Sequence, residues 1–444
     1  MTKEEKIAFI ILAAGKGTRM KSNRFKPLHD VAGLPMIKHV IRTAQHFKPD
    51  EIAIVVASDM TDLESVVAPH PIIIQKEQNG TGGAVLAAED YFKNYDGIIV
   101  ILFADTPLIT AESIQKLIET KKSNPEAGLV YSAIQLDDPK TYGRMILDKD
   151  GYLEKIIEYK DASEAQRKIN LCNGAVVVAD GRSLFPWLKK INNKNAQAEY
   201  YLTDLPPIAK ENGKMSKIAL VSPEDMAGVN TRAELAETEK IAQRRLRHFH
   251  MINGATLIDP ETTYFSYDTK IGQDVTIEPN VYFGTGVTVE DRVIIHAFTH
   301  LEGAHLKAGS IVGPFARLRG HTTLEEEAIV GNFVEAKNAH FDKGAKAKHH
   351  AYLSDVTIGE KSNIGAGVIT CNYDGNNKYQ TTIGKYVFVG SDTTLIAPLV
   401  LNDGAYIGAG STITQDVPKD SLSLTRAPQI TKQGWAIEFR KRKN

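Results

Sequence analysis

A six-residue repeat dominates the C-terminal part of this chain and limits what that part can fold into. Beyond Pro260, apolar residues recur at every sixth position in four successive phases. The repeated positions are Ile271, Ile277, Phe283, Val289, Ile295 and Leu301, then Val312, Leu318, Leu324, Val330 and Ala336, then Ile358 and Ile364, and finally Ile383, Val389, Leu395, Leu401, Ile407 and Ile413. One such run can arise by chance in a β-sandwich, whereas four phases are typical of hexapeptide repeats.

Glycine directly follows many of these apolar residues, at points where a tight backbone corner requires a small side chain. These glycines are Gly272, Gly313, Gly331, Gly359, Gly365, Gly384, Gly390 and Gly408. Each hexad then forms one flat side of a coil, and stacked coils bury a continuous core. We therefore predict a left-handed parallel β-helix with a C-terminal tail over residues 253–444. Two interruptions of the repeat, Phe341–Thr357 and Thr370–Thr382, are expected to form surface loops.

Residues 1–230 have a different pattern, in which short β-rich runs alternate with helix-like stretches. The predicted strands are Ile7–Ala14, Ile52–Ala57, Ile98–Phe103 and Leu129–Ala133, and one predicted helix is Pro35–Phe47. Such alternation is typical of a mostly parallel sheet covered by helices, so we predict a Rossmann-like α/β domain. The charged segment 231–252 predicts a connecting helix.

Length and charge limit the classes of function. A chain of 444 residues exceeds the size of a single hydrophobic core, which predicts at least two domains. With 53 Lys and Arg against 54 Asp and Glu, no overall basic field is present to hold nucleic acid or an anionic membrane. The two cysteines, Cys172 and Cys371, lack metal-ligand spacing, and we expect buried thiols in a reducing compartment. The short apolar run after the N-terminus leads into no cleavage site, which favours a cytoplasmic protein.

The first predicted strand ends in the segment LAAGKGTRM, which could bind phosphate. Gly15 and Gly17 allow backbone N–H groups to approach phosphate oxygens, while Lys16 and Arg19 add positive charge. The segment lacks the ending of a Walker loop and the third glycine of a dinucleotide fingerprint, so a plain strand-to-helix turn remains an alternative. Asp105 follows another apolar strand, at the edge of a parallel sheet where ligands bind. Beside a polyphosphate this carboxylate would be a Mg²⁺ ligand.

Two sets of motifs together resemble a known enzyme family. LAAGKGTRM, FKPL and FADTPL resemble the sugar-nucleotide pyrophosphorylases. GPFARLR, VGNFVEAK, HHAYLSD, NIGAG, TCNYDG and VGSDT narrow the resemblance to the bifunctional N-acetylglucosamine-1-phosphate uridyltransferase / glucosamine-1-phosphate N-acetyltransferases. The match extends from Ile10 to about Trp435. The resemblance implies acetyl transfer from acetyl-CoA to glucosamine 1-phosphate, followed by uridylyl transfer from UTP, which yields UDP-N-acetylglucosamine for peptidoglycan and lipopolysaccharide.

For the first domain the resemblance implies a nucleotide site, a sugar site and a metal site. Residues expected to bind UTP or the UDP-sugar are Leu12, Ala13, Ala14, Gly15, Lys16, Lys26, Gln75, Gly80, Thr81, Phe103, Ala104, Asp105, Gly143, Glu158, Asn173 and Asn230. Lys26 and Arg19 are the expected catalytic cations, and Asp105 and Asn230 the expected Mg²⁺ ligands. Phe103 and Ala104 stand where many relatives have Tyr and Gly, which removes a hydroxyl from the site.

For the second domain the chemistry requires a base with a pKa near neutrality, and histidine is suited to that role. His349 and His350 are both candidates from the residues alone. The resemblance selects His349, and Glu335 is the expected partner of its imidazole. It also implies that Arg319, Lys337, Tyr352 and Asn363 bind the glucosamine phosphate. Acetyl-CoA is expected to contact Ala366, Asn372, Tyr373, Ser391, Ala409 and Arg426.

The resemblance further implies a homotrimer formed through the β-helix, with small-molecule substrates and no nucleic acid or membrane partner. Two alternatives compete with a bifunctional enzyme. One is a sugar-1-phosphate nucleotidyltransferase whose β-helix is only structural or regulatory. The other is an inactive subunit that binds nucleotide sugars. His349, Lys337 and the TCNYDG insertion disfavour the first, since a mere scaffold requires none of them, and retention of Asp105, Lys26 and Asn230 disfavours the second.

Overall fold

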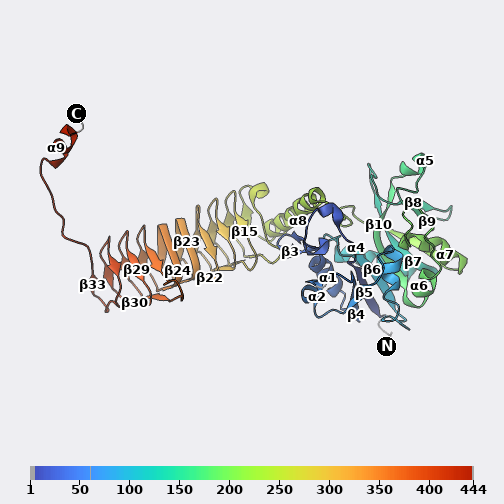
Figure 1. Ribbon diagram of the computed structural model, residues 1–444, viewed down its shortest axis with the longest axis horizontal. Helices are drawn as coiled ribbons and strands as arrows, with labels where there is room; N and C mark the ends of the chain where they lie inside the picture. Colours follow the sequence, from blue (N-terminus) through green and yellow to red (C-terminus); the bar gives the residue numbers. More distant parts are fainter. Residues whose placement is uncertain (1–5, 61, 443–444) are drawn as a thin grey trace. The chain divides into compact units, whose positions relative to one another are not determined.

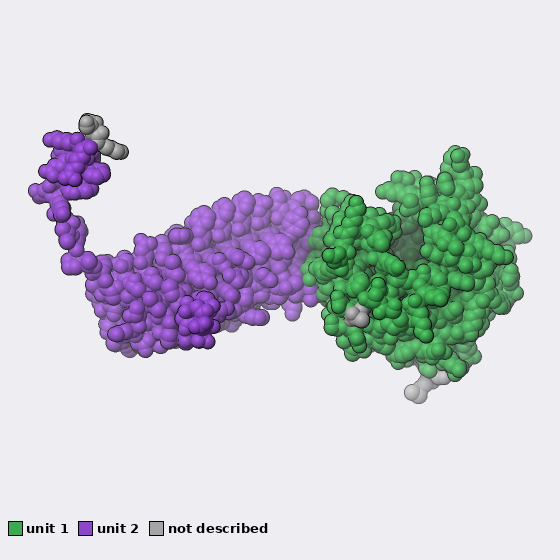
Figure 2. Space-filling view, viewed as in Figure 1, with its two compact units in different colours: residues 1–242 green, residues 243–444 purple. Residues whose placement is uncertain are grey.

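The computed structural model describes residues 6–60 and 62–442, which form two compact units, residues 1–242 and 243–444 (Figures 1 and 2). Unit 1 is built on a mostly parallel sheet with helices, and unit 2 is a left-handed parallel β-helix, so the predicted fold class is confirmed. The division between the units falls within helix α8 (Arg232–Ile252). No helix among the described residues has the length and apolar character needed to cross a bilayer.

The sheet of unit 1 has nine strands, seven of them in the order β11-β7-β10-β6-β1-β4-β5, with β8 paired to β10 and β9. The strands are β1 (Ile7–Leu12), β4 (Glu51–Ala57), β5 (Ile72–Gln75), β6 (Ile98–Phe103), β7 (Ala127–Gln135), β8 (Arg144–Leu147), β9 (Leu153–Ile157), β10 (Leu171–Asp180) and β11 (Met215–Leu220), beside a small hairpin of β2 (Asp30–Val31) and β3 (Leu34–Pro35). Strand β1 is parallel to both β4 and β6, whereas β10 is antiparallel to β6 and β7. The carboxyl ends of β1, β4, β5 and β6 therefore meet at one edge.

Helices cover the sheet of unit 1, because its central strands are apolar on both faces (Figure 1). Phe9 and Ile11 of β1 belong to one apolar cluster, and the alternating Ala8 and Ile10 to another. The helices are α1 (Met36–Gln45), α2 (Asp62–Val67), α3 (Thr81–Leu86), α4 (Ala111–Ser123), α5 (Glu164–Arg167), α6 (Gly181–Leu188) and α7 (Leu205–Glu211), with short 3₁₀ turns η1 (Thr18–Met20), η2 (Lys26–Leu28) and η3 (Leu202–Asp204).

Unit 2 stacks short strands into coils of three flat sides (Figure 1). After the 3₁₀ turn η4 (Pro260–Thr262), most strands have only two or three residues, and the inward residues of most of them belong to one core that runs from Ala255 to Val417. The strands are β12 (Thr256–Leu257), β13 (Lys270–Ile271), β14 (Thr276–Ile277), β15 (Tyr282–Phe283), β16 (Thr288–Val289), β17 (Ile294–Ile295), β18 (His300–Leu301), β19 (Ala304–Leu306), β20 (Ile311–Val312), β21 (Arg317–Arg319), β22 (Thr322–Leu324), β23 (Ile329–Phe341), β24 (Lys346–Ile358), β25 (Asn363–Ile364), β26 (Ile369–Cys371), β27 (Thr381–Ile383), β28 (Phe388–Val389), β29 (Thr394–Ile396), β30 (Leu399–Leu401), β31 (Tyr406–Ile407), β32 (Thr412–Ile413) and β33 (Leu422–Ser423).

Glycine is required at some corners because successive coils approach closely there. A Cβ atom on Gly365 would lie 2.6 Å from the backbone nitrogen of Ser391, and one on Gly390 would lie 2.5 Å from that of Ala409. No side chain fits at such distances. The expectation that these corners need a small residue is confirmed at both positions.

The changes of phase arise from coils of different length. Tyr282 pairs with His300 in a coil of 18 residues, whereas Val330 pairs with Ala347 in a coil of 17. The expected loop at Phe341–Thr357 is wrong, because β24 occupies most of this segment as a regular strand. Its inward positions include the small residue Ala347, which the apolar pattern did not reveal. The second interruption is a true insertion, since Ile358 pairs with Ile383.

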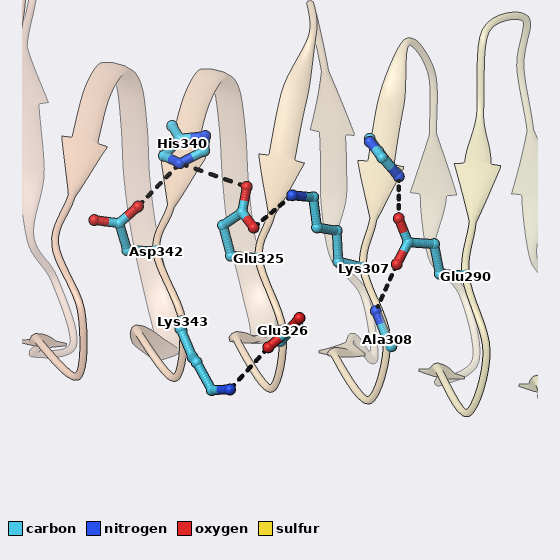
Figure 3. A network of polar contacts seen from close by, with 9 residues as sticks. Glu290, Lys307, Ala308, Glu325, Glu326, His340, Asp342 and Lys343 are labelled. Carbon is cyan, nitrogen blue, oxygen red and sulfur yellow. Dashed lines mark hydrogen bonds and ion pairs between the residues drawn. The ribbon is translucent and has the colours of Figure 1, made fainter.

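Two surfaces of unit 2 have opposite character. One flat side, here the polar side, carries a network in which Glu325 pairs with Lys307 (2.6 Å) and lies near His340, while Glu290 accepts a hydrogen bond from His305 (Figure 3). The aromatic edge consists of the stacked rings of Phe298, Phe315 and Phe333 on successive coils, with centroids 4.8 and 5.2 Å apart. About half of each phenylalanine is exposed.

The remaining expectations on unit 2 concern its tail and the cysteines. Helix α9 (Trp435–Lys441) lies in the tail beyond the coils, and its aromatic residues are exposed (Figure 1). Cys172 and Cys371 are both free thiols. The former is buried as expected, but Cys371 is only partly buried because it ends β26 beside the insertion.

Candidate active sites of the two units

A cavity of about 390 Å³ lies in unit 1, beyond the carboxyl ends of β1, β5 and β6. Most residues predicted to bind the nucleotide line it: Leu12, Ala13, Ala14, Gly15, Lys16, Lys26, Gln75, Gly80, Thr81, Phe103, Ala104 and Asp105. These residues come from segments far apart in the sequence, and the sheet brings them together because the parallel strands β1, β5 and β6 all end at this edge.

The two glycines of the loop after β1 serve different purposes. A Cβ atom on Gly15 would meet no protein atom within 4 Å, so its side of the backbone is open toward the cavity. Gly17 has φ +62°, and a Cβ atom there would lie 2.6 Å from Cβ of Lys26. Gly15 therefore leaves room for a ligand, whereas Gly17 leaves room for Lys26.

Four predicted residues form a charged cluster at the edge of this cavity. The ammonium group of Lys26 contacts a carboxylate oxygen of Asp105 and lies 3.2 Å from Oδ1 of Asn230. Arg19 Nη2 also donates to Oδ1 of Asn230, at 2.9 Å. Two oxygen ligands therefore converge on one cation, which is the arrangement that a bound metal ion requires. No cluster of three or more His, Cys, Asp or Glu that could hold a metal occurs in the part of the chain that the structure describes.

The residues expected at the nucleotide are held by local hydrogen bonds. The buried amide of Gln75 donates to the carbonyl of Gly80 at 3.2 Å. Oγ1 of Thr81 accepts a hydrogen bond from the backbone N–H of Leu202 at 3.0 Å. A Cβ atom on Gly80 would lie 2.6 Å from the carbonyl oxygen of Tyr200, so that only glycine fits.

The three residues expected at the sugar also come together. A Cβ atom on Gly143 would lie 3.4 Å from Oε1 of Glu158 and 3.6 Å from Cβ of Asn173. Burial raises the pKa of Glu158, while a hydrogen bond from the hydroxyl of Thr203 (3.1 Å) opposes that rise. The structure thus places a partly buried carboxylate and an amide side chain around a backbone position with little room for a side chain, which suits recognition of hydroxyl and amide groups.

Four further residues line the cavity and were not predicted: Pro27, Gln78, Ala84 and Glu199. Gln78 donates from Nε2 to the carbonyl oxygen of Ala14 at 2.9 Å and so holds the loop after β1. It lies in the segment QKEQNGTGG, three residues after the predicted Gln75, and this proximity was the available signal. Glu199 lies in a long connection with no pattern that could have identified it.

In unit 2 the predicted residues occupy neighbouring coils. Arg319 of β21 pairs in register with Lys337 of β23, and Glu335 pairs with Tyr352 of β24. Arg319, Lys337 and Tyr352 therefore share one flat side. Asn363 does not, because it pairs with Lys346 on the adjacent side.

His349 lies at the corner between these two sides. It is exposed, and its Nδ1 lies 2.8 Å from Oδ1 of Asn332. The expected contact with Glu335 is wrong, since Glu335 accepts hydrogen bonds from Arg319 at 2.7 and 2.9 Å. The register explains this, because Asn332 is opposite His349 on the preceding coil. His350 has φ +35° and turns the corner.

The residues expected at acetyl-CoA continue from this corner along later coils. The backbone N–H of Gly367 donates to the carbonyl of His350, that of Asp392 to Ala366, and that of Gly410 to Ser391. Arg426 donates to the carbonyl oxygen of Ala409 at 2.8 Å. These contacts place Ala366, Ser391, Ala409 and Arg426 in one row.

The two remaining residues expected at acetyl-CoA differ in exposure. Asn372 is buried, and its amide donates to the carboxylate of Asp355 and to Oγ of Ser354 (3.3 Å). Tyr373 lies in the insertion, where its hydroxyl donates to the carbonyl of Gly375. In the single chain only Tyr373 of this pair is exposed.

The fold and these two sites define a transferase with a nucleotidyltransferase unit and a hexapeptide-repeat unit. Residues 9–191 match the MobA-like NTP transferase domain, and residues 268–303 match the bacterial transferase hexapeptide (six repeats). Proteins named bifunctional protein GlmU are similar over nearly the whole chain. The protein of Paramagnetospirillum magneticum is 45% identical, covering 98% of this chain and 97% of its own length. That of Zymomonas mobilis is 44% identical, covering 100% and 99%.

The chain belongs to the family of bifunctional GlmU proteins. The resemblance inferred from the motifs is confirmed, and so is the prediction of a bifunctional enzyme. The alternative of a nucleotidyltransferase with a merely structural β-helix is disfavoured. The role of each site residue stays a prediction.

Proposed function

We propose that this chain makes UDP-N-acetylglucosamine in two steps, one in each unit. Unit 2 transfers the acetyl group of acetyl-CoA to the amine of glucosamine 1-phosphate. Unit 1 transfers the uridylyl group of UTP to the resulting N-acetylglucosamine 1-phosphate and releases pyrophosphate. The observation that carries the proposal is the presence in one chain of the Lys26–Asp105–Asn230 cluster and of His349 at the corner from which the row of predicted acetyl-CoA residues continues.

In unit 1 catalysis consists mainly of positioning and charge neutralisation. A phosphate oxygen of the sugar phosphate attacks the α-phosphorus of UTP, and the bond between that phosphorus and the bridging oxygen of pyrophosphate breaks. No general base is needed because the nucleophile is already an anion. Lys16, Arg19 and Lys26 bind the triphosphate, and Gly143, Glu158 and Asn173 hold the acetylated sugar.

The donor set of the charged cluster fits Mg²⁺. Asp105 and Asn230 offer the oxygen ligands that this ion prefers, and both already face one cation, the ammonium group of Lys26. When bound, Mg²⁺ would neutralise charge on the triphosphate. Lys26 then shifts to the phosphates, which its flexible side chain permits.

In unit 2 the amine of glucosamine 1-phosphate attacks the thioester carbonyl and the coenzyme A thiolate leaves. His349 takes the proton that the amine releases. Asn332 at Nδ1 holds the imidazole in one orientation. Arg319, Lys337 and Tyr352 bind the phosphate of the sugar, with Asn363 across the corner.

We propose that the working form is a homotrimer in the cytoplasm. His349 projects from a convex corner, and Tyr352 and Asn363 lie on different sides of it, so a single chain encloses no ligand there. A second copy packed along the aromatic edge would supply the opposite wall. The polar side is unsuited to this contact because its charges are already paired.

A coupled assay on the purified protein tests the proposal. Supplied with acetyl-CoA, glucosamine 1-phosphate, UTP and Mg²⁺, the enzyme should form UDP-N-acetylglucosamine, detected by chromatography and pyrophosphate release. Omission of any one component should prevent its formation. Formation of the product without acetyl-CoA would contradict the acetyl step, and failure with supplied N-acetylglucosamine 1-phosphate would contradict the uridylyl step.

A further inference from the structure

The first turn of helix α8 contacts the candidate metal site of unit 1. Thr231 precedes the helix, and its Oγ1 accepts a hydrogen bond from the N–H of Glu234 at 3.2 Å. The carboxylate of Glu234 in turn accepts from the N–H of Thr231 at 3.0 Å. These reciprocal bonds form a capping box, which fixes where the helix begins.

Glu234 also holds the expected metal ligand Asn230. Its Oε2 accepts a hydrogen bond from the N–H of Asn230 at 2.6 Å. On the other side, the N–H of Val229 donates to the carbonyl oxygen of Asp105 at 2.9 Å. The backbone of Asn230 is therefore anchored to both the helix and the other predicted ligand, which leaves its side-chain oxygen directed at Arg19 and Lys26.

Arg232, in the same turn, holds the loop that carries the catalytic cations. Its Nε donates to the carbonyl oxygen of Met20 at 3.3 Å, and its Nη1 lies 3.2 Å from Nδ1 of His29. A guanidinium group only donates, so Nδ1 of the buried His29 accepts. Met20 directly follows Arg19, and His29 lies three residues after Lys26, so each anchor point is close to one of the two cations in the sequence.

We infer that Glu234 and Arg232 are positioning residues of the uridylyl-transfer site, an inference that rests on the proposed function. Glu234 orients the oxygen of Asn230 toward the metal position, and Arg232 fixes the loop that presents Arg19 and Lys26. Neither side chain reaches the cavity lining itself. Loss of a residue that orients a metal ligand through a hydrogen bond typically lowers metal affinity or activity by about 10- to 100-fold.

Two readouts on the full-length protein test the role of Glu234. Calorimetric titration with UTP and Mg²⁺ measures binding, and pyrophosphate release measures the apparent Mg²⁺ requirement. Glu234→Ala should lower the affinity for UTP and Mg²⁺ by roughly tenfold and raise the Mg²⁺ concentration needed for activity by a similar factor. Glu234→Gln should restore them, since a glutamine oxygen can accept the same hydrogen bonds. Glu237→Ala is the matched control, because Glu237 is exposed and forms an ion pair with Lys240 (2.8 Å) on the surface of the same helix.

Arg232→Met should raise the KM for UTP by on the order of tenfold, because the loop loses both anchors. Arg182→Met, which removes an exposed arginine elsewhere in unit 1, should leave this KM unchanged. Acetyl transfer by unit 2 of the same chain reports on folding and should stay at the wild-type rate in every variant.

Two results would overturn the inference. In the first, Glu234→Ala and Arg232→Met bind UTP and Mg²⁺ as the wild type does. In the second, acetyl transfer falls in parallel with uridylyl transfer, which would mean that the turn only supports the fold. A wild-type protein that binds UTP and Mg²⁺ but forms no product would contradict the proposed function. The inference on Glu234 could still be tested in that case, because the binding titration compares Glu234→Ala with Glu237→Ala without any product being formed.

Discussion

The two candidate sites differ in shape, and the difference indicates how each can work. Unit 1 encloses a cavity of about 390 Å³ at the edge of a sheet, and one chain supplies its walls. Unit 2 presents His349 on a convex corner, with predicted substrate residues on two flat sides. A concave site can bind its ligand within a single chain, whereas a convex one requires a second surface. The uridylyl step should therefore be independent of assembly, and the acetyl step should depend on it.

Removal of the expected base should have the largest effect on one site only. We expect His349→Ala to lower acetyl transfer by about 10²- to 10⁴-fold, because general-base catalysis contributes on this scale. Uridylyl transfer from supplied N-acetylglucosamine 1-phosphate should be unchanged. Separate assays of the two steps measure this. His350→Ala is the control and should retain acetyl transfer, and a wild-type acetyl rate in His349→Ala would refute the base assignment.

A charge on the aromatic edge should separate the two activities by another route. Phe315→Glu places a carboxylate between the rings of Phe298 and Phe333. The φ angle of +55° at position 315 is retained, since glutamate replaces another residue that has a side chain. Burying an unpaired charge in a contact costs about 3 kcal/mol or more, so association should weaken at least about a hundredfold. Light scattering should show smaller species, with acetyl transfer reduced at low protein concentration and uridylyl transfer retained.

The matched control adds the same charge to the polar side. Thr382 lies in register with Thr357 and His340 on that side and is exposed. Thr382→Glu should leave both the assembly and the two activities unchanged. Should Phe315→Glu keep the wild-type mass and acetyl rate, the aromatic edge would not be the contact between copies.

The sequence predicted the fold class well because both patterns are periodic. The apolar hexads fix the inward positions of the β-helix, and the alternating runs fix the parallel sheet of unit 1. The pattern failed where the inward residue is small: Ala347 made a regular strand look like a loop. A residue such as Glu199 could not be predicted, since it reaches the cavity through a connection without local periodicity.

Orientation of the side chains in the sites was also beyond the sequence. Glu335 and Asn332 both precede His349, and only the register of β23 against β24 decides which of them is its neighbour. Coil length sets that register, and one residue more or less in a coil changes it. The motifs could therefore select His349 but not its partner.

The smallest expected effect concerns the pH dependence of the concave site. Burial raises the pKa of Glu158, and the hydroxyl of Thr203 partly opposes this by donating to its carboxylate. Thr203→Val removes that hydrogen bond, so the pKa of Glu158 should rise further and the carboxylate should be lost at a higher pH. The KM for N-acetylglucosamine 1-phosphate should then begin to increase at a higher pH than in the wild type, whereas Thr203→Ser should behave like the wild type.

The sign of the stability effect separates this change from acid unfolding. A carboxyl group whose pKa is raised in the folded state binds its proton more tightly there than in the unfolded chain. Its contribution to the free energy of unfolding therefore increases as the pH falls through the folded pKa. Loss of sugar binding on acidification should thus occur without any destabilisation by Glu158, whose protonation favours the folded state. Acetyl transfer in unit 2 should have the same pH dependence in Thr203→Val as in the wild type, and a shift of both activities together would contradict the assignment of Glu158 to the sugar.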